Sequence, residues 1–286
     1  MLWLLLSLLT ALSVSAQDTW VKRFFSEMTT YEMAAYPLIY SLPLFAAAAP
    51  FVPRPPLGSE FAWAFAVSVP LNAVGFLLYM RAIQVSPLSL TVPYLAFTPV
   101  FMLCTGYLFL GEIPGSRGVA GILTICLGGY ILNIDPGRWG LLAPFRAILE
   151  ETGSWMMLVV AFVYSFTSVI GKKAILHSSP LFFGVWFYIV FNLCLILLLR
   201  LSGKIRFAAF RESPIKGFLS GVFLCLQTLL HCFAVSLVEA AVMISVKRLS
   251  ILFSILLGRA VFKEQHASIR FSGALLMLAG TLLITL

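Results

Sequence analysis

The chain alternates between long apolar runs and short polar connections over its 286 residues. An α-helix needs about 20 apolar residues to cross the roughly 30 Å hydrocarbon core of a bilayer. Ten runs approach that length, and polar residues, prolines or glycines bound each of them. We therefore predict ten transmembrane helices, approximately over residues 2–21, 33–52, 61–83, 87–110, 115–134, 154–171, 180–200, 215–236, 239–262 and 268–286.

Composition supports an all-α integral membrane protein. The chain is 61% hydrophobic and 10% charged, whereas soluble domains contain about 25% charged residues. Its formal net charge of +8 is interpreted as a signal of membrane topology and of contact with anionic lipid, not of nucleic-acid binding. The sequence does not indicate an oligomeric state.

The two halves of the sequence are related. A shift of 152 positions places Tyr79–Ile134 on His231–Leu286 without a gap. The matching positions are mainly glycines and a glutamate: Gly106 with Gly258, Glu112 with Glu264, Gly121 with Gly273, and Gly128 with Gly280. Glycines spaced seven apart share a helix face and allow close helix packing in lipid, so we expect a packing role for them.

This repeat predicts a domain plan. Residues 1–134 and 153–286 are two five-helix repeats, and residues 135–152 are a linker with a short interfacial helix. Five helices is an odd number, so the second repeat must enter the membrane from the opposite side. Such inverted repeats are common in secondary transporters.

Residues 1–16 have two interpretations. The apolar run followed by Ser-Val-Ser-Ala before Gln17 is typical of a signal peptide and its cleavage site. No basic residue precedes the run, however, and Trp3 matches Trp155 in the repeat. We expect this first helix to be retained.

Catalytic and metal-binding motifs are not evident. The five cysteines lie in apolar runs, which is typical of small hydrophobic side chains, and the three histidines are far apart. The 11 acidic residues fall almost entirely in predicted loops or at helix ends. Membrane enzymes need a nucleophile with its base, a metal cluster or paired acids. We therefore predict neither an enzyme nor a bound cofactor.

Lys247 and Arg248 stand side by side inside the ninth predicted helix. A basic side chain at membrane depth costs about 2.5–3.5 kcal/mol on insertion scales and is a marker of function. Glu239, the nearest acid in that helix, is eight residues away, which corresponds to about 12 Å of helix rise. The equivalent positions of the first half are Leu95 and Ala96, so the architecture does not require the charges. We favour an anion-binding cavity over a buried structural pair.

Further cavity candidates are polar residues in the middle of predicted helices. Gln227 and His231 are four residues apart and share a helix face. The predicted binding residues are Lys247, Arg248, Gln227, His231, Tyr94, Asn72, Tyr164 and Ser168.

The motifs of the two halves resemble those of the EamA-type drug/metabolite transporters. They are Pro99-Val-Phe101, Leu110-Gly-Glu112, Gly121 and Gly128 in the first half, and Lys263-Glu264, Gly273 and Gly280 in the second. The Lys247-Arg248 pair is similar to a helix 9 pair that binds substrate phosphate in the triose-phosphate translocators. This resemblance implies a transporter fold and, for the pair, an anion-binding role.

We therefore predict a secondary transporter that moves a small polar, anionic metabolite by alternating access. Two alternatives stay open: a carrier of neutral, zwitterionic or amphipathic metabolites in which the pair is structural, and a non-transporting scaffold or receptor. Proton-driven carriers usually hold an acid at membrane depth. Since the sequence places none there, it predicts a facilitator or exchanger.

Basic residues also predict the orientation of the chain in its membrane. Short cytoplasmic loops are enriched in Lys and Arg. Lys247 and Arg248 are left out of the count. The side of the membrane that holds the connections after the even-numbered predicted helices has only four of the other basic residues: Arg54, Arg117, Lys172 and Lys173. The other 13 lie on the opposite side: Lys22, Arg23, Arg81, Arg138, Arg146, Arg200, Lys204, Arg206, Arg211, Lys216, Arg259, Lys263 and Arg270. The count places both termini outside the cytoplasm.

Overall fold

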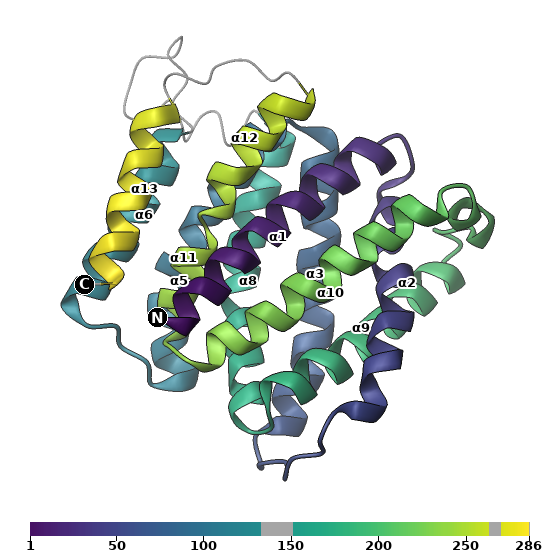
Figure 1. The fold of residues 1–286 in the computed structure, drawn as a ribbon, viewed down its shortest axis with the longest axis horizontal. Coiled ribbons are helices and arrows are strands. Elements are labelled where there is room, and N and C mark those ends of the chain that lie inside the picture. The colour runs from purple at the N-terminus through teal and green to yellow at the C-terminus, as the bar shows by residue number, and fades with distance from the viewer. Residues whose placement is uncertain (133–150, 263–269, 286) are drawn as a thin grey trace.

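The structure, a computed structural model, describes residues 1–132, 151–262 and 270–285. Within these ranges the regular secondary structure is helical. The elements are α1 (Leu2–Phe25), α2 (Thr30–Ala48), η1 (Ala49–Phe51), α3 (Phe61–Val85), α4 (Leu88–Thr91), η2 (Val92–Phe97), α5 (Thr98–Leu110), α6 (Ser116–Leu132), α8 (Thr152–Leu176), α9 (Pro180–Leu201), η3 (Phe207–Arg211), α10 (Pro214–Ser236), α11 (Ala240–Lys247), α12 (Ser250–Phe262) and α13 (Arg270–Thr285). Figure 1 shows their arrangement as one helical bundle.

The helices are built for a lipid environment. Eight helical segments of the described chain are long and apolar enough to cross a membrane: 2–25, 30–51, 61–85, 92–110, 152–176, 180–201, 214–236 and 240–262. Two shorter apolar helices cover 116–131 and 275–284. Large aliphatic side chains remain exposed on the outer surface, among them Leu12, Leu197 and Leu198. The chain is an integral, multi-pass membrane protein.

Each of the ten predicted runs contains a helix. The second ends in the 3₁₀ segment η1, and the fourth and ninth are not single helices as predicted. The fourth is divided into α4, η2 and α5, and the ninth into α11 and α12. The first helix also continues beyond the predicted end at residue 21, as far as Phe25. These differences matter because they change which polar residues lie inside the bundle.

The two interruptions have different causes. In the first half, Pro93 and Pro99 lack the N–H that an α-helix needs, and η2 takes up the interruption as a 3₁₀ segment. In the second half, Leu249 donates its N–H to the carbonyl of Val246, three residues back, at 3.0 Å. Ile251 and Leu252 also bond three residues back, each at 3.0 Å. The ninth run is therefore tightened into a 3₁₀ turn just after Lys247.

Helices α6 and α13 are the fifth members of the two halves, and they pack against each other side by side (Figure 1). A Cβ added at Gly121 would lie 2.6 Å from the carbonyl oxygen of Gly280, and one at Gly128 would lie 2.6 Å from that of Gly273. The lower-numbered residue of one helix thus meets the higher-numbered residue of the other. The two helices run antiparallel, as an inverted repeat requires, and the predicted packing role of these glycines is confirmed.

A lysine in the first helix of each repeat makes polar contacts at one end of the bundle. At one end, Lys172 of α8 pairs with Glu112, which follows α5, and donates to the carbonyl of Val238 at 2.7 Å. At the other end, Lys22 of α1 donates to the carbonyl of Ser86, after α3, at 2.5 Å. Ser86 and Val238 are equivalent positions under the 152-residue shift. In each repeat, a lysine of the first helix therefore holds the turn after the third helix, and Lys172 also pairs with Glu112 of the other repeat.

Several sequence predictions fall outside the described residues. They are the interfacial helix predicted within the 135–152 linker, of which only residues 151 and 152 are described, and the Lys263-Glu264 motif.

Candidate functional site

A cavity of about 160 Å³ lies inside the bundle. Its walls come from α1, α2, α3, η2, α8, α9, α10 and α11, so both halves of the chain contribute. An apolar cavity of about 150 Å³ is enough to hold benzene. The space therefore suits a small, ring-sized molecule.

Seven of the eight predicted binding residues line this cavity. They are Lys247, Arg248, Gln227, His231, Asn72, Tyr164 and Ser168. The exception is Tyr94, which is buried but does not line the cavity. It lies in the 3₁₀ segment η2, where successive side chains differ by about 120°. The next residue, Leu95, is the one that reaches the cavity wall.

Lys247 and Arg248 lie where α11 ends and the 3₁₀ turn begins. The guanidinium of Arg248 is buried and donates through Nη2 to Oγ1 of Thr98 at 2.8 Å. Its Nε has no hydrogen-bond partner among the described residues. No carboxylate in the described parts of the chain lies within ion-pair distance of either basic group. The two charges face the cavity without a salt bridge, which leaves them able to bind an anion.

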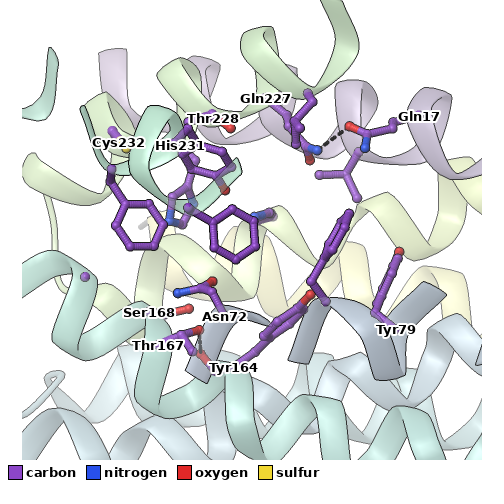
Figure 2. Close-up of a pocket in the computed structure, with 18 of the residues that line it drawn as sticks. Gln17, Asn72, Tyr79, Tyr164, Thr167, Ser168, Gln227, Thr228, His231 and Cys232 are labelled. Atoms are coloured by element: carbon purple, nitrogen blue, oxygen red, sulfur yellow. Dashed lines mark hydrogen bonds between the residues drawn. The ribbon is translucent and has the colours of Figure 1, made fainter. Parts of the chain in front are cut away.

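Polar side chains occupy opposite walls of the cavity (Figure 2). Gln227 of α10 donates to the side-chain oxygen of Gln17 on α1, and His231 lies one helical turn further along α10. The Nδ1 atom of His231 is buried and has no partner within the described residues. On the facing wall, Asn72 donates to the carbonyl of Ser68 at 2.8 Å, and its amide oxygen stays available to a ligand.

Aromatic rings form the remaining surface. Phe183, Phe187 and Phe191 follow one another at four-residue spacing on α9 and line the cavity. Their ring centroids are 4.9 and 5.8 Å apart, with interplanar angles of 14° and 8°. Phe76 of α3 meets Phe191 edge-on at 6.1 Å. The cavity thus combines a continuous aromatic face with a basic pair.

Asp18 corrects the expectation that no acid lies at membrane depth. Asp18 falls near residue 21, the predicted end of the first helix, and one turn before Lys22, but α1 continues for seven residues, about 10 Å, beyond it. Asp18 is 4% exposed, lines the cavity and accepts a hydrogen bond from Tyr79. Lys22 instead donates to the carbonyls of Ile83 and Ser86. The signal available in the sequence was that apolar residues resume after Asp18, with Trp20, Val21 and then Phe24-Phe25.

The described residues contain no cluster of three or more His, Cys, Asp or Glu side chains able to hold a metal ion. The described lining of the cavity offers charged groups, hydrogen-bonding groups and aromatic rings.

Two helical repeats around a central cavity, with a discontinuous helix in each, form an architecture common among secondary transporters. A family model gives this class a more specific assignment. The model of the EamA-like transporter family matches residues 1–134 and 151–286. The chain belongs to the EamA-like transporter family and is a membrane transporter.

A solved crystal structure of a protein has a similar fold, with a TM-score of 0.67 over 97% of this chain and 96% of that chain. The two sequences are 13% identical, so this likeness concerns the fold alone. No curated protein matches the chain.

Proposed function

We propose that this transporter moves a small anionic metabolite and binds its negative group between Lys247 and Arg248. The supporting observation is that two neighbouring basic residues line the cavity without an ion pair among the described residues. A buried charge without a partner is costly, and a substrate anion would supply that partner. The aromatic face of α9 would contact the less polar part of the same molecule.

Transport would occur by alternating access, with the two repeats rocking around the cavity. The interruptions at η2 and after α11 occupy equivalent positions of the two halves, and Leu95 and Lys247, which line the cavity, are equivalent residues. Discontinuous helices of this kind mark the binding site of many inverted-repeat carriers. We infer ten crossings, with α6 and α13 as the two short ones. Asp18 removes the ground on which the sequence predicted a facilitator or exchanger, so this mode of transport now depends on Asp18 not carrying protons.

A second candidate is a carrier of neutral or zwitterionic molecules in which the basic pair is structural. Two observations favour it. Arg248 links the end of α11 to Thr98 at the start of α5, and an acidic side chain, Asp18, lines the same cavity. In that case the guanidinium would hold the two interrupted helices together, and the substrate would need no net negative charge.

The test uses the purified full chain with a panel of small anions, including inorganic phosphate, sulfate, carboxylates and phosphorylated sugars, together with neutral and zwitterionic analogues. Thermal stabilisation identifies binders, because a ligand stabilises the folded state in proportion to its concentration relative to Kd. The variants are Lys247→Gln and Arg248→Gln. Arg54→Gln, which removes an exposed charge, is the matched control.

Anions should stabilise the wild type and the Arg54→Gln variant, and each cavity variant should lose about 2 kcal/mol of binding free energy, roughly thirtyfold in Kd. Uptake of the bound anion into reconstituted vesicles should fall accordingly, while membrane insertion is unchanged. Normal anion transport by both cavity variants would refute the proposal. Variants that fail to fold would establish the structural role of the pair.

A further inference from the structure

Asp18 is the one carboxylate among the described residues that line the cavity. It is placed there by α1, which contacts α11 and α12 and so lies beside the interrupted ninth run. Tyr79 of α3 donates a hydrogen bond to its carboxylate oxygen Oδ2. This bond connects the Asp18 side chain to α3, a second helix of the first repeat, and fixes the position of the carboxylate at the cavity wall. Asp18 is therefore held in a defined position and is not a surface charge.

Asp18 does not form a salt bridge with Lys247 or Arg248. Lys247 and Arg248 line the same space as Asp18, yet no carboxylate oxygen among the described residues is within 4.0 Å of their nitrogens. Opposite charges that share a poorly hydrated space still attract at longer range. The acid thus offsets part of the positive charge of the empty cavity, and it leaves the basic groups accessible because it does not occupy their hydrogen-bonding positions.

We propose that Asp18 is the internal counter-ion of the Lys247–Arg248 site and competes electrostatically with the anion that binds there. This inference rests on the proposed anion-binding function and adds a tuning residue to it. The carboxylate lowers affinity for the anion, so bound substrate can leave, and it reduces the unbalanced charge of the carrier when no substrate is present. Tyr79 acts as a positioning residue through its bond to Asp18.

The test measures binding of inorganic phosphate to the purified full chain by isothermal titration calorimetry. Asp18→Asn removes the charge and keeps an oxygen able to accept from Tyr79. Asp18→Glu keeps the charge. Glu32→Gln is a matched control, since it removes one negative charge from a buried carboxylate that pairs with Arg206 at 3.2 Å and does not line the cavity.

A unit charge about 10 Å away, at an effective dielectric constant of about 20, changes a binding constant roughly tenfold. Asp18→Asn should therefore bind phosphate about tenfold more tightly than the wild type, while Asp18→Glu and Glu32→Gln stay close to it. Adding Lys247→Gln to Asp18→Asn should cancel the gain.

Unchanged, weaker or undetectable phosphate binding by Asp18→Asn overturns the role of Asp18. If Lys247→Gln weakens binding in that case, the proposed anion site survives. A gain in Asp18→Asn that persists when Lys247 or Arg248 is replaced would instead overturn the anion site. Phosphoethanolamine, a zwitterion, provides a final comparison. If Asp18→Asn binds phosphoethanolamine more weakly and shows no gain for phosphate, Asp18 binds a cationic group of the substrate. That outcome would overturn the counter-ion role.

Discussion

Lys172 and Glu112 form a salt bridge between the two repeats, with side chains that are 5% and 18% exposed. The other carboxylate oxygen of Glu112 accepts from the N–H of Ala240 at 2.8 Å, where α11 begins. Lys172 in turn donates to the carbonyl of Val238. One ion pair thus joins the end of α5, the C-terminal part of α8 and the start of the helix that carries Lys247.

Removing one partner of this pair should destabilise the fold. For Glu112→Gln or Lys172→Gln we expect a loss of about 3–5 kcal/mol in the free energy of unfolding, because the remaining charge stays buried without a counter-ion. Denaturant titration of the detergent-solubilised protein measures this. A loss no larger than that of an exposed pair would contradict the expectation.

The neighbouring Lys173 provides the matched control. It pairs with Glu60 at 2.9 Å, and the two side chains are 23% and 40% exposed. The hydrogen bond from Lys173 holds the pKa of Glu60 below its usual value. Solvent screens such pairs, so Lys173→Gln should change stability little.

The close contact of α6 and α13 predicts a cost for any side chain at Gly128. A Cβ there would lie 2.6 Å from the carbonyl oxygen of Gly273 and 2.9 Å from the backbone nitrogen of Met277. Gly128→Ala should therefore destabilise the protein by about 1–3 kcal/mol through overpacking. A Cβ at Gly115 meets nothing within 4 Å, so Gly115→Ala is the control. Equal unfolding midpoints for both variants would show that the helices can separate without cost.

Coupling is a third prediction. If Asp18 acts as a counter-ion and not as a proton carrier, uptake of a bound anion should persist with a protonophore and should not follow an imposed pH gradient. Asp18→Asn should slow uptake into empty vesicles more than exchange with preloaded substrate, because the unloaded carrier then holds two basic groups without compensation. Uptake that collapses with the protonophore would identify proton coupling.

Orientation is the fourth prediction. The basic residues predict that the connections after the first, third, fifth, seventh and ninth predicted helices lie in the cytoplasm and that both termini lie outside it. A reporter that is active only in the cytoplasm should stay silent when fused after Leu286 and should be active when inserted in the connection between α9 and α10. The reverse pattern would invert the assignment.

The sequence alone determined the membrane class, the ten apolar runs, the two repeats and the basic pair. These features are carried by local composition and by spacing along the chain: a bilayer demands long apolar runs, a repeat leaves glycines and glutamates at equal intervals, and a charge in an apolar run is conspicuous. Gln227, His231 and the Lys247–Arg248 pair were found for the same reason.

Only the tertiary structure decided what lies next to what. Asp18 lines the cavity because α1, which packs against α10 and α12, continues past it. Tyr94 does not line the cavity because it lies in the 3₁₀ segment η2. The chain has many phenylalanines, and the sequence does not indicate that those of α9 form one face of the cavity. The Glu112–Lys172 pair joins residues 60 positions apart. Such contacts depend on how helices pack, and helix packing is set by the shapes of all the side chains together.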